Sequence, residues 1–121
     1  MKSVGQIEKL HAAHKTTARV FVVYIREAHP NERNNPFQIG EPKTLKERQE
    51  AAADFAKKLK LSVPILVDAM DDQVDELYAG WPDRVYVIDR DGKIALKGGP
   101  GPGGFSPSVR DAFDLLERWA K

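Results

Sequence analysis

Apolar residues recur along the chain at two spacings, one typical of helices and one typical of buried strands. Residues 4–16 place apolar side chains three and four positions apart with polar residues opposite, which predicts an amphipathic helix. Residues 45–60 repeat this spacing behind Thr44 and Glu47, the pair that forms a capping box at a helix start. The run 20–25 is continuously apolar, β-branched and aromatic, and this is typical of a strand covered on both faces.

Turn residues divide the rest of the chain into short elements. Residues 29–42 contain three prolines, three asparagines and a glycine, which predicts a long loop. Further along we expect a strand near a sheet edge over 63–67 and a short helix over 71–78. A hairpin of strands 84–88 and 93–97 follows. After it we expect a loop over 98–107 without regular structure and a helix that begins around Pro107 and runs to 120. The predicted order is therefore α-β-α-β-α-β-β-α, which indicates an α/β protein.

Composition limits the classes of function. The length of 121 residues suits one domain, and 41% apolar with 31% charged residues is typical of a globular protein. A net charge of +1 is too small for the basic surface that nucleic-acid binding needs. We find no apolar run long enough to span a bilayer and no signal-peptide order, so we predict a cytoplasmic protein without a membrane or nucleic-acid partner.

The chain contains no cysteine. Disulfides, thiolate catalysis and thiolate metal sites are therefore excluded within these residues. The remaining nucleophiles are serine, threonine, lysine, tyrosine and carboxylates, and each needs an activating neighbour near neutral pH. We predict no cofactor.

Five parts of the chain resemble one known family. A proline ahead of a hairpin strand, here Trp81-Pro82, together with the element order, resembles the thioredoxin fold as redoxins elaborate it. The string Val23-Tyr24-Ile25-Arg26-Glu27-Ala28-His29-Pro30 is more specific, and with it the chain resembles the iodothyronine deiodinase family. The other matching segments are Arg48, Val67–Asp71, Arg84–Ile88 and the glycine-rich stretch Gly98–Phe105. The resemblance implies a thioredoxin-like mixed sheet with flanking helices.

The resemblance also implies a reductive chemistry that these residues cannot perform. Members of that family use a selenocysteine or cysteine at the start of the first helix, just after a β-strand, to take iodine from a phenolic ring or for related reductions. Met1 lies almost at the matching position, and both the residue and the strand are missing. We therefore expect a single, N-terminally truncated deiodinase-like domain over 1–121, inactive as given and without the first central strand. One hypothesis for the truncation is a coding frame that starts after a selenocysteine codon taken as a stop.

Loss of a central strand leaves backbone groups without partners along two strand edges. An unpaired buried group costs roughly 1 to 3 kcal/mol, which a marginally stable domain cannot tolerate many times. We expect strand 20–25 and strand 84–88 to close on each other, or a homodimer to form through the exposed edges. The alternative function is therefore a non-catalytic binding or assembly module.

The candidate site residues follow from the same segments. Glu27 and His29 lie at the carboxyl end of a predicted strand, where ligand sites of open α/β sheets gather. The resemblance implies that they support proton delivery; the simpler interpretation is a surface pair. We predict that a small aromatic or phenolic ligand contacts Trp81, Pro82, Arg84 and Phe105, although aromatic residues near chain turns, such as Trp81 and Phe105, more often serve core or lid packing. A non-thiol hydrolase or isomerase built on Glu27 and His29 is a third, weaker hypothesis.

Two other polar groups have structural explanations. His11 and His14 are three residues apart on a predicted helix with Glu8 one turn earlier, a geometry that suits a metal ion, but two histidines make a weak motif and a solvated or half-buried helix face explains them better. The acidic residues between positions 68 and 76 lack the spacing of a calcium loop, and helix capping explains them better.

Overall fold

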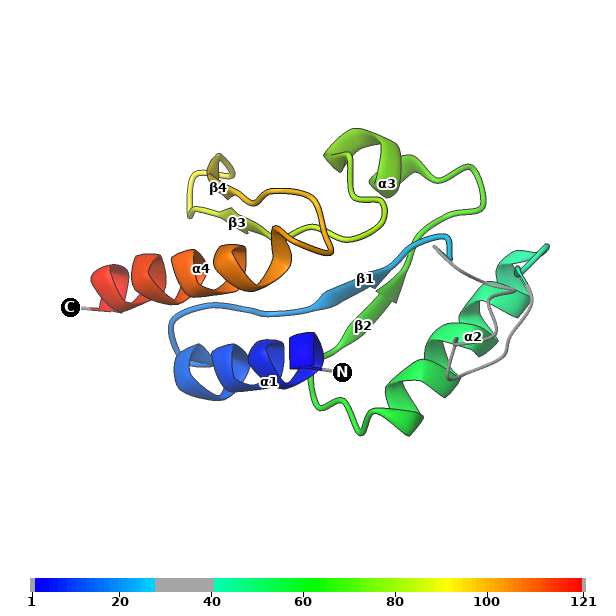
Figure 1. Ribbon diagram of the computed structural model, residues 1–121, viewed down its shortest axis with the longest axis horizontal. Helices are drawn as coiled ribbons and strands as arrows, with labels where there is room; N and C mark the ends of the chain where they lie inside the picture. Colours follow the sequence, from blue (N-terminus) through cyan, green and yellow to red (C-terminus); the bar gives the residue numbers. More distant parts are fainter. Residues whose placement is uncertain (1, 28–40, 121) are drawn as a thin grey trace. The chain divides into compact units, whose positions relative to one another are not determined.

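The computed structural model describes residues 2–27 and 41–120 (Figure 1). Its elements are α1 (Lys2–His14), β1 (Val22–Tyr24), α2 (Leu45–Lys58), β2 (Ile65–Val67), α3 (Gln73–Tyr78), β3 (Tyr86–Ile88), β4 (Ile94–Lys97) and α4 (Phe105–Ala120). The predicted α/β class and the predicted order of elements are confirmed. The predicted loop 29–42 lies almost entirely outside the described residues.

The chain divides into two compact units, Met1–Val20 with Pro82–Lys121, and Phe21–Trp81. Each unit holds one two-stranded sheet, parallel between β1 and β2 and antiparallel between β3 and β4. The expected closure of strand 20–25 on strand 84–88 concerns strands of different units and stays a prediction, as does a single thioredoxin-like sheet.

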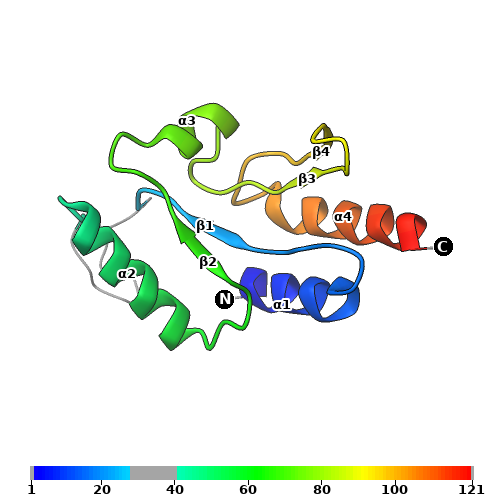
Figure 2. The same ribbon diagram turned by 180° about the vertical axis from the view of Figure 1, so that it is seen from behind.

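In the unit Phe21–Trp81, helix α2 lies beside β2 (Figures 1 and 2). The core of this unit consists of buried Tyr24, Ala51 and Ala52, with Phe55, Ile65 and Val67 packed against them. The rings of Tyr24 and Phe55 meet edge to face with 5.6 Å between their centroids. Phe21 is 54% exposed, so the prediction of a strand covered on both faces is wrong at this residue. The alternation of a strand sends Phe21 and Tyr24 to opposite faces, and α2 covers only the face of Tyr24.

The start of α2 confirms the predicted capping box. Thr44 has an extended backbone and its Oγ1 accepts a hydrogen bond from the Glu47 N–H at 3.1 Å. The Glu47 carboxylate reaches back to the N–H of Lys43, at 2.7 Å, one residue before the cap. Two backbone donors at the helix start are thus satisfied locally, which explains why the boundary could be predicted from sequence.

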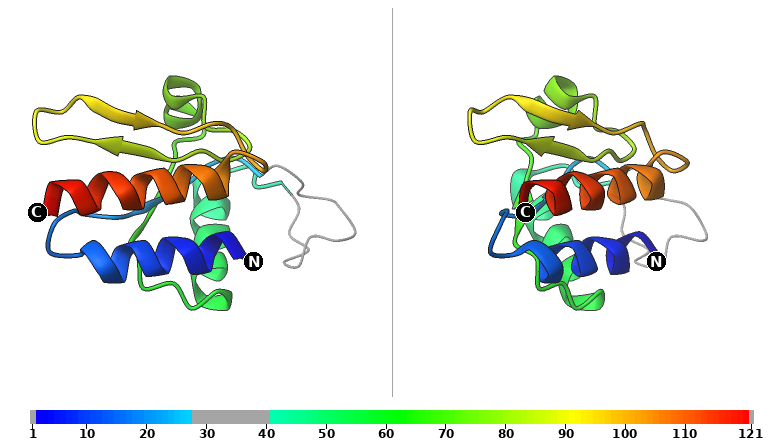
Figure 3. Two further views of the ribbon diagram at one scale, coloured as in Figure 1. Left: turned by 60° about the vertical axis from the view of Figure 1, so that its left-hand side comes forward. Right: turned by 90° about the vertical axis from the view of Figure 1, so that its left-hand side faces the viewer.

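In the other unit, α1 and α4 lie side by side and the hairpin β3–β4 lies against α4 (Figure 3). Leu10, Ala112 and Leu116 form its buried core, with Val87 and Leu96 of the hairpin packed against them. The hairpin turn is built as predicted, because Asp89 Oδ1 accepts hydrogen bonds from the N–H groups of residues 91 and 93, both at 2.9 Å, and Gly92 takes a positive φ of 79°.

Helix α4 begins at Phe105, inside the stretch 98–107 that we expected to lack regular structure. That prediction is wrong for residues 105–107. A proline within the first helical turn removes an N–H that has no intrahelical partner there, so Pro107 is compatible with the helix. Within the described part of the chain, each helix is too short or too polar to span a lipid bilayer.

His14 belongs to the interior of this unit. Its side chain is buried, its ring meets Phe113 edge to face at 5.5 Å, and its Nε2 lies 3.6 Å from Glu117 Oε1. Among the described residues no group of three histidine or acidic side chains is arranged to hold a metal ion. A helix-packing role for His14 accounts for these contacts.

Candidate functional site

Polar side chains gather where β1 and β2 end. The two strands are parallel, so their carboxyl ends lie at the same edge of the sheet. Arg26 and Glu27 follow β1, and Asp68 follows β2. The N–H of Asp68 donates to the Tyr24 carbonyl at 2.9 Å, which extends the pairing to the point where both chains leave the sheet. Open α/β sheets place their ligand sites at this edge.

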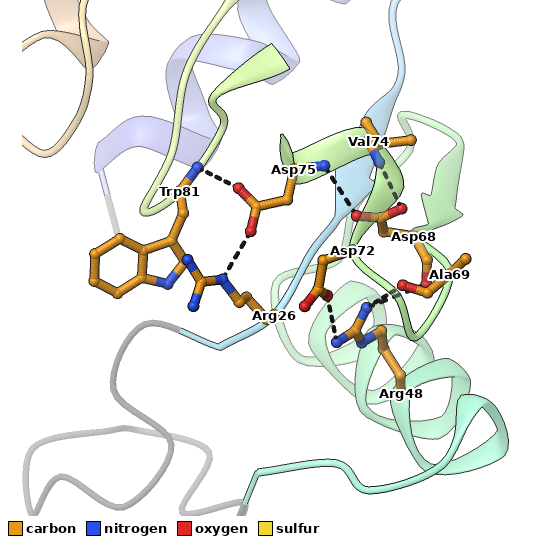
Figure 4. Close-up of polar contacts among 8 residues, drawn as sticks. All are labelled: Arg26, Arg48, Asp68, Ala69, Asp72, Val74, Asp75 and Trp81. Atoms are coloured by element: carbon orange, nitrogen blue, oxygen red, sulfur yellow. Dashed lines mark hydrogen bonds and ion pairs between the residues drawn. The ribbon is translucent and has the colours of Figure 1, made fainter. Parts of the chain in front are cut away.

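Asp68 connects this edge to helix α3. Its side chain is 2% exposed, and its two carboxylate oxygens accept hydrogen bonds from the N–H groups of Val74 and Asp75, each at 3.0 Å (Figure 4). The residue at the formal N-cap, Asp72, has a left-handed backbone with φ of 59° and makes no capping hydrogen bond with its side chain. The predicted capping role is therefore confirmed for Asp68, which lies at the end of β2, whereas Asp72 does not cap the helix with its side chain.

Asp75 joins Arg26 and Trp81 to the residues around Asp68. It is buried, and its Oδ2 lies 2.7 Å from Arg26 Nε while its Oδ1 accepts the N–H of Trp81 at 2.9 Å (Figure 4). The Arg26 guanidinium lies over the Trp81 ring, 4.9 Å from its centroid. The hydrogen bond and charge of Asp75, with smaller contributions from Asp72 and Glu41, raise the pKa of Arg26 above its ordinary value. Arg26 is therefore a permanent cation stacked on an aromatic ring.

Arg48 closes the network from α2. It is 4% exposed, its Nη1 donates to the carbonyls of Asp68 and Ala69 at 3.3 and 2.8 Å, and its Nη2 lies 3.0 Å from Asp72 Oδ1. A buried guanidinium needs partners for its donors. Nη1 and Nη2 find them here and hold the turn after β2, whereas the buried Nε has no hydrogen-bond partner among the described residues. The strand ends, α2 and α3 are thus joined by charge-assisted hydrogen bonds.

Glu27 lies next to this network. It is half-buried, and burial raises the pKa of its carboxyl above the ordinary 4.5. Desolvation disfavours the charged form, so Glu27 keeps its proton to a higher pH than an exposed glutamate does. A carboxyl of this kind at the edge of a sheet is suited to donate a proton. His29, the predicted partner of Glu27, lies outside the described residues.

The four predicted ligand contacts divide between the two units. Trp81 belongs to the unit of the polar network and is 40% exposed. Pro82, Arg84 and Phe105 belong to the other unit, where Arg84 is half-buried and Phe105 is the first residue of α4. Their common contact with a ligand stays a prediction.

With this geometry in place, the chain can be compared with known proteins. A family model described as iodothyronine deiodinase matches residues 1–119. The chain belongs to the iodothyronine deiodinase family. The family resemblance predicted from the sequence is thus confirmed.

Relatives within the deiodinase family are about equally similar. A type I iodothyronine deiodinase from Xenopus laevis is 31% identical over 118 residues, which cover 95% of this chain and 45% of that protein. A thyroxine 5-deiodinase from Sparus aurata is 30% identical over 123 residues, covering 98% of this chain and 45% of the relative. A type II iodothyronine deiodinase from Petromyzon marinus is 33% identical over 105 residues, 83% of this chain and 35% of that protein. The chain spans less than half the length of these deiodinases.

Sequence reasoning gave no role to Arg26 or Arg48 and only a capping role to Asp75; of the three, Arg48 has a recognisable signal. Arg48 falls on the apolar face of α2, between Leu45 and Ala52 at helical spacing, and a charged residue in such a position indicates a buried partner. The partner itself could not be predicted, because Asp68 and Ala69 are 20 and 21 residues away in the sequence.

Proposed function

We propose that this chain is a deiodinase-type, thioredoxin-like domain that binds a small phenolic ring beside Glu27 and that has no reductive activity of its own. The observation that supports it most is the half-buried Glu27 carboxyl with a raised pKa, at the carboxyl edge of a parallel strand pair. Membership of the deiodinase family supports the choice of a phenolic ligand.

Trp81 and Glu27 have different roles in the proposed binding of a phenol. Trp81 offers a partly exposed aromatic ring on which a phenol can stack; Asp75 holds the Trp81 backbone N–H, and the Arg26 guanidinium lies over the indole. Glu27 in its protonated form donates a hydrogen bond to the phenolic oxygen, and it is the residue from which a proton would reach the ring where electrons are supplied. Replacing iodine by hydrogen on an aryl ring needs a proton and two electrons, and a thiol or selenol is the usual source of those electrons. The 121 residues contain no cysteine to supply them.

Binding is testable with the aryl iodide 2-iodophenol, because its heavy atom quenches indole fluorescence on contact. The chain has two tryptophans, so Trp119→Phe leaves Trp81 as the only reporter. We expect saturable quenching of this variant by 2-iodophenol, and weaker binding after Glu27→Gln. Trp81→Phe, which leaves only Trp119 of α4, is the matched control and should show unsaturable, collisional quenching.

The chemical half of the proposal needs a separate assay. Iodide release from 2-iodophenol with dithiothreitol should equal that of the buffer alone. Iodide release above that level would contradict the absence of reductive activity, and quenching that never saturates at Trp81 would contradict phenol binding.

A second function, assembly through strand edges, is favoured by the size of the sheets. Among the described strands each one pairs on one side only, and an isolated two-stranded sheet is marginally stable in water. A second copy that adds a strand would satisfy the free edges. Light scattering over a hundredfold range of concentration should then show a dimer mass, and a monomer mass throughout would rule this function out.

A further inference from the structure

Arg26 immediately precedes Glu27, so the sequence places a permanent cation next to the group that the proposed function makes a proton donor. A cation within about 4 to 6 Å of a carboxyl lowers its pKa by roughly 1 to 3 units and would favour loss of its proton. In the structure the Arg26 guanidinium binds other residues. Asp75 and Trp81 hold the Arg26 guanidinium, and within the described residues no ion pair or hydrogen bond joins Arg26 to Glu27.

We propose that Asp75 and Trp81 are positioning residues that hold the Arg26 guanidinium and so keep this cation from pairing with the adjacent Glu27 carboxyl. The proposal rests on the proposed function only in assigning a proton-donating role to Glu27. The arrangement itself is a property of the free protein.

Asp75 and Trp81, which hold Arg26, are themselves fixed in place. The Asp75 carboxylate cannot rotate freely, because one oxygen accepts the Trp81 N–H at 2.9 Å while the other faces Arg26 Nε at 2.7 Å. The Asp75 backbone is held in turn by the buried Asp68 carboxylate, 3.0 Å from its N–H. The indole covers the guanidinium from a further side, 4.9 Å from Cζ. A rigid, buried acceptor of this kind keeps an arginine in one geometry better than a surface carboxylate does.

The negative charges around Arg26 also favour the position of its guanidinium beside Asp75. Asp75, Asp72 and Glu41 all stabilise the guanidinium, whereas Glu27 does not contribute. Burial raises the pKa of Glu27. The carboxylate that binds Arg26 in this structure is that of Asp75.

The variant Asp75→Asn separates positioning from simple stability. Asparagine keeps the shape of the side chain and a carbonyl oxygen for the Trp81 N–H, but it removes the charge that attracts Arg26. A freed Arg26 then becomes available to Glu27. A merely structural role for Asp75 would change the free energy of unfolding without changing the titration of Glu27.

The test follows the Glu27 side-chain carboxyl carbon by NMR between pH 3 and 9, with the resonance assigned by its loss in Glu27→Gln. We expect the pKa of Glu27 to fall by about one unit in Asp75→Asn, and to return toward the wild-type value in Asp75→Asn/Arg26→Gln. Asp54→Asn, which removes a carboxylate that pairs with Lys58 on α2, is the charge-matched control and should leave the Glu27 titration unchanged.

Three results would overturn the proposal. The Glu27 titration could be the same in folded Asp75→Asn as in the wild type. Its fall could persist in the double variant, which would make loss of the Asp75 charge the whole cause. The single variant Arg26→Gln, which does not depend on the folding of Asp75→Asn, could raise the pKa of Glu27, which would mean that Arg26 already acts on it. All three measurements use the free protein, so failure of phenol binding would refute the proposed function and leave this result standing.

Discussion

Asp68 joins the end of β2 to the start of α3 through one buried carboxylate. Its oxygens satisfy two N–H groups of a short helix that has no other side-chain cap. Without that carboxylate both donors lose their acceptor, and one of them is in a buried hydrogen bond. Residues of this kind are the ones at which a single substitution has a large effect on stability.

We predict that Asp68→Ala lowers the free energy of unfolding by about 2 to 4 kcal/mol, because each backbone N–H that is left without an acceptor costs roughly 1 to 3 kcal/mol. Asp68→Asn keeps one acceptor and should cost less than the alanine variant. Urea denaturation followed by circular dichroism measures both. Asp54→Ala on the exposed face of α2 is the control, with a change below about 1 kcal/mol. Equal losses for Asp68→Ala and Asp54→Ala would show that the cap is unimportant.

Glu27 predicts a pH dependence of stability. Its pKa is higher in the folded chain than the ordinary 4.5, so between these two values the folded state binds more protons than the unfolded state. Stability contributed by Glu27 therefore falls as the pH rises through this window and stays lower above it. Glu27→Gln removes the effect, and its free energy of unfolding relative to wild type should rise between pH 4 and pH 7. A difference that is constant over this range would contradict burial of the carboxyl.

At the scale of elements, the glycine-rich stretch after β4 lies tightly against its neighbours. The N–H of Gly98 continues the hairpin by donating to the Val85 carbonyl at 2.8 Å. A Cβ at Gly98 would lie 2.8 Å from that carbonyl oxygen and would also collide with the Ser108 side chain in α4. Close approach of the backbone therefore explains one of the glycines that the resemblance had only identified as a motif.

We predict that Gly98→Ala lowers the free energy of unfolding by about 1 to 3 kcal/mol, the usual cost of overpacking. Gly103→Ala is the matched control in the same stretch, because a Cβ there meets nothing within 4 Å. Thermal unfolding of the two variants should separate them clearly. Similar melting temperatures for both would contradict the tight packing of Gly98 against β3 and α4.

At the scale of the whole molecule, each compact unit has a small core. Three buried residues form the centre of each, Leu10, Ala112 and Leu116 in one and Tyr24, Ala51 and Ala52 in the other. Units of this size bury a smaller fraction of their surface than larger domains do and are only marginally stable alone. The prediction that residues 1–121 form one domain therefore amounts to a prediction that both units unfold together.

Single-tryptophan variants test this directly, since Trp119 belongs to one unit and Trp81 to the other. Leu116→Ala is introduced into both the Trp81→Phe and the Trp119→Phe variant. It should lower the free energy of unfolding by about 2 to 5 kcal/mol, because it leaves a cavity. If the chain is one cooperative domain, the urea midpoints reported by both tryptophans shift equally. A shift seen only by Trp119 would establish two independently unfolding units.

The sequence by itself determined what depends on neighbours within one turn or one hairpin. The order of elements, the Thr44–Glu47 cap and the Asp89–Gly92 turn rest on contacts between residues at most four positions apart, and local spacing encodes such contacts. The family was recognisable for a related reason, because short strings such as Val23–Pro30 carry the resemblance without any knowledge of packing.

Only the tertiary structure decided which distant groups meet. The pair of Arg26 and Asp75 spans 49 residues, and the choice between Asp75 and the adjacent Glu27 as the partner of Arg26 depends on how α3 is placed over the strand ends. The parallel pairing of β1 with β2, two strands far apart in the sequence, likewise depends on which apolar faces are covered in the packed chain. Burial and long-range hydrogen bonding set these outcomes, and both are properties of the packed chain that no local pattern contains.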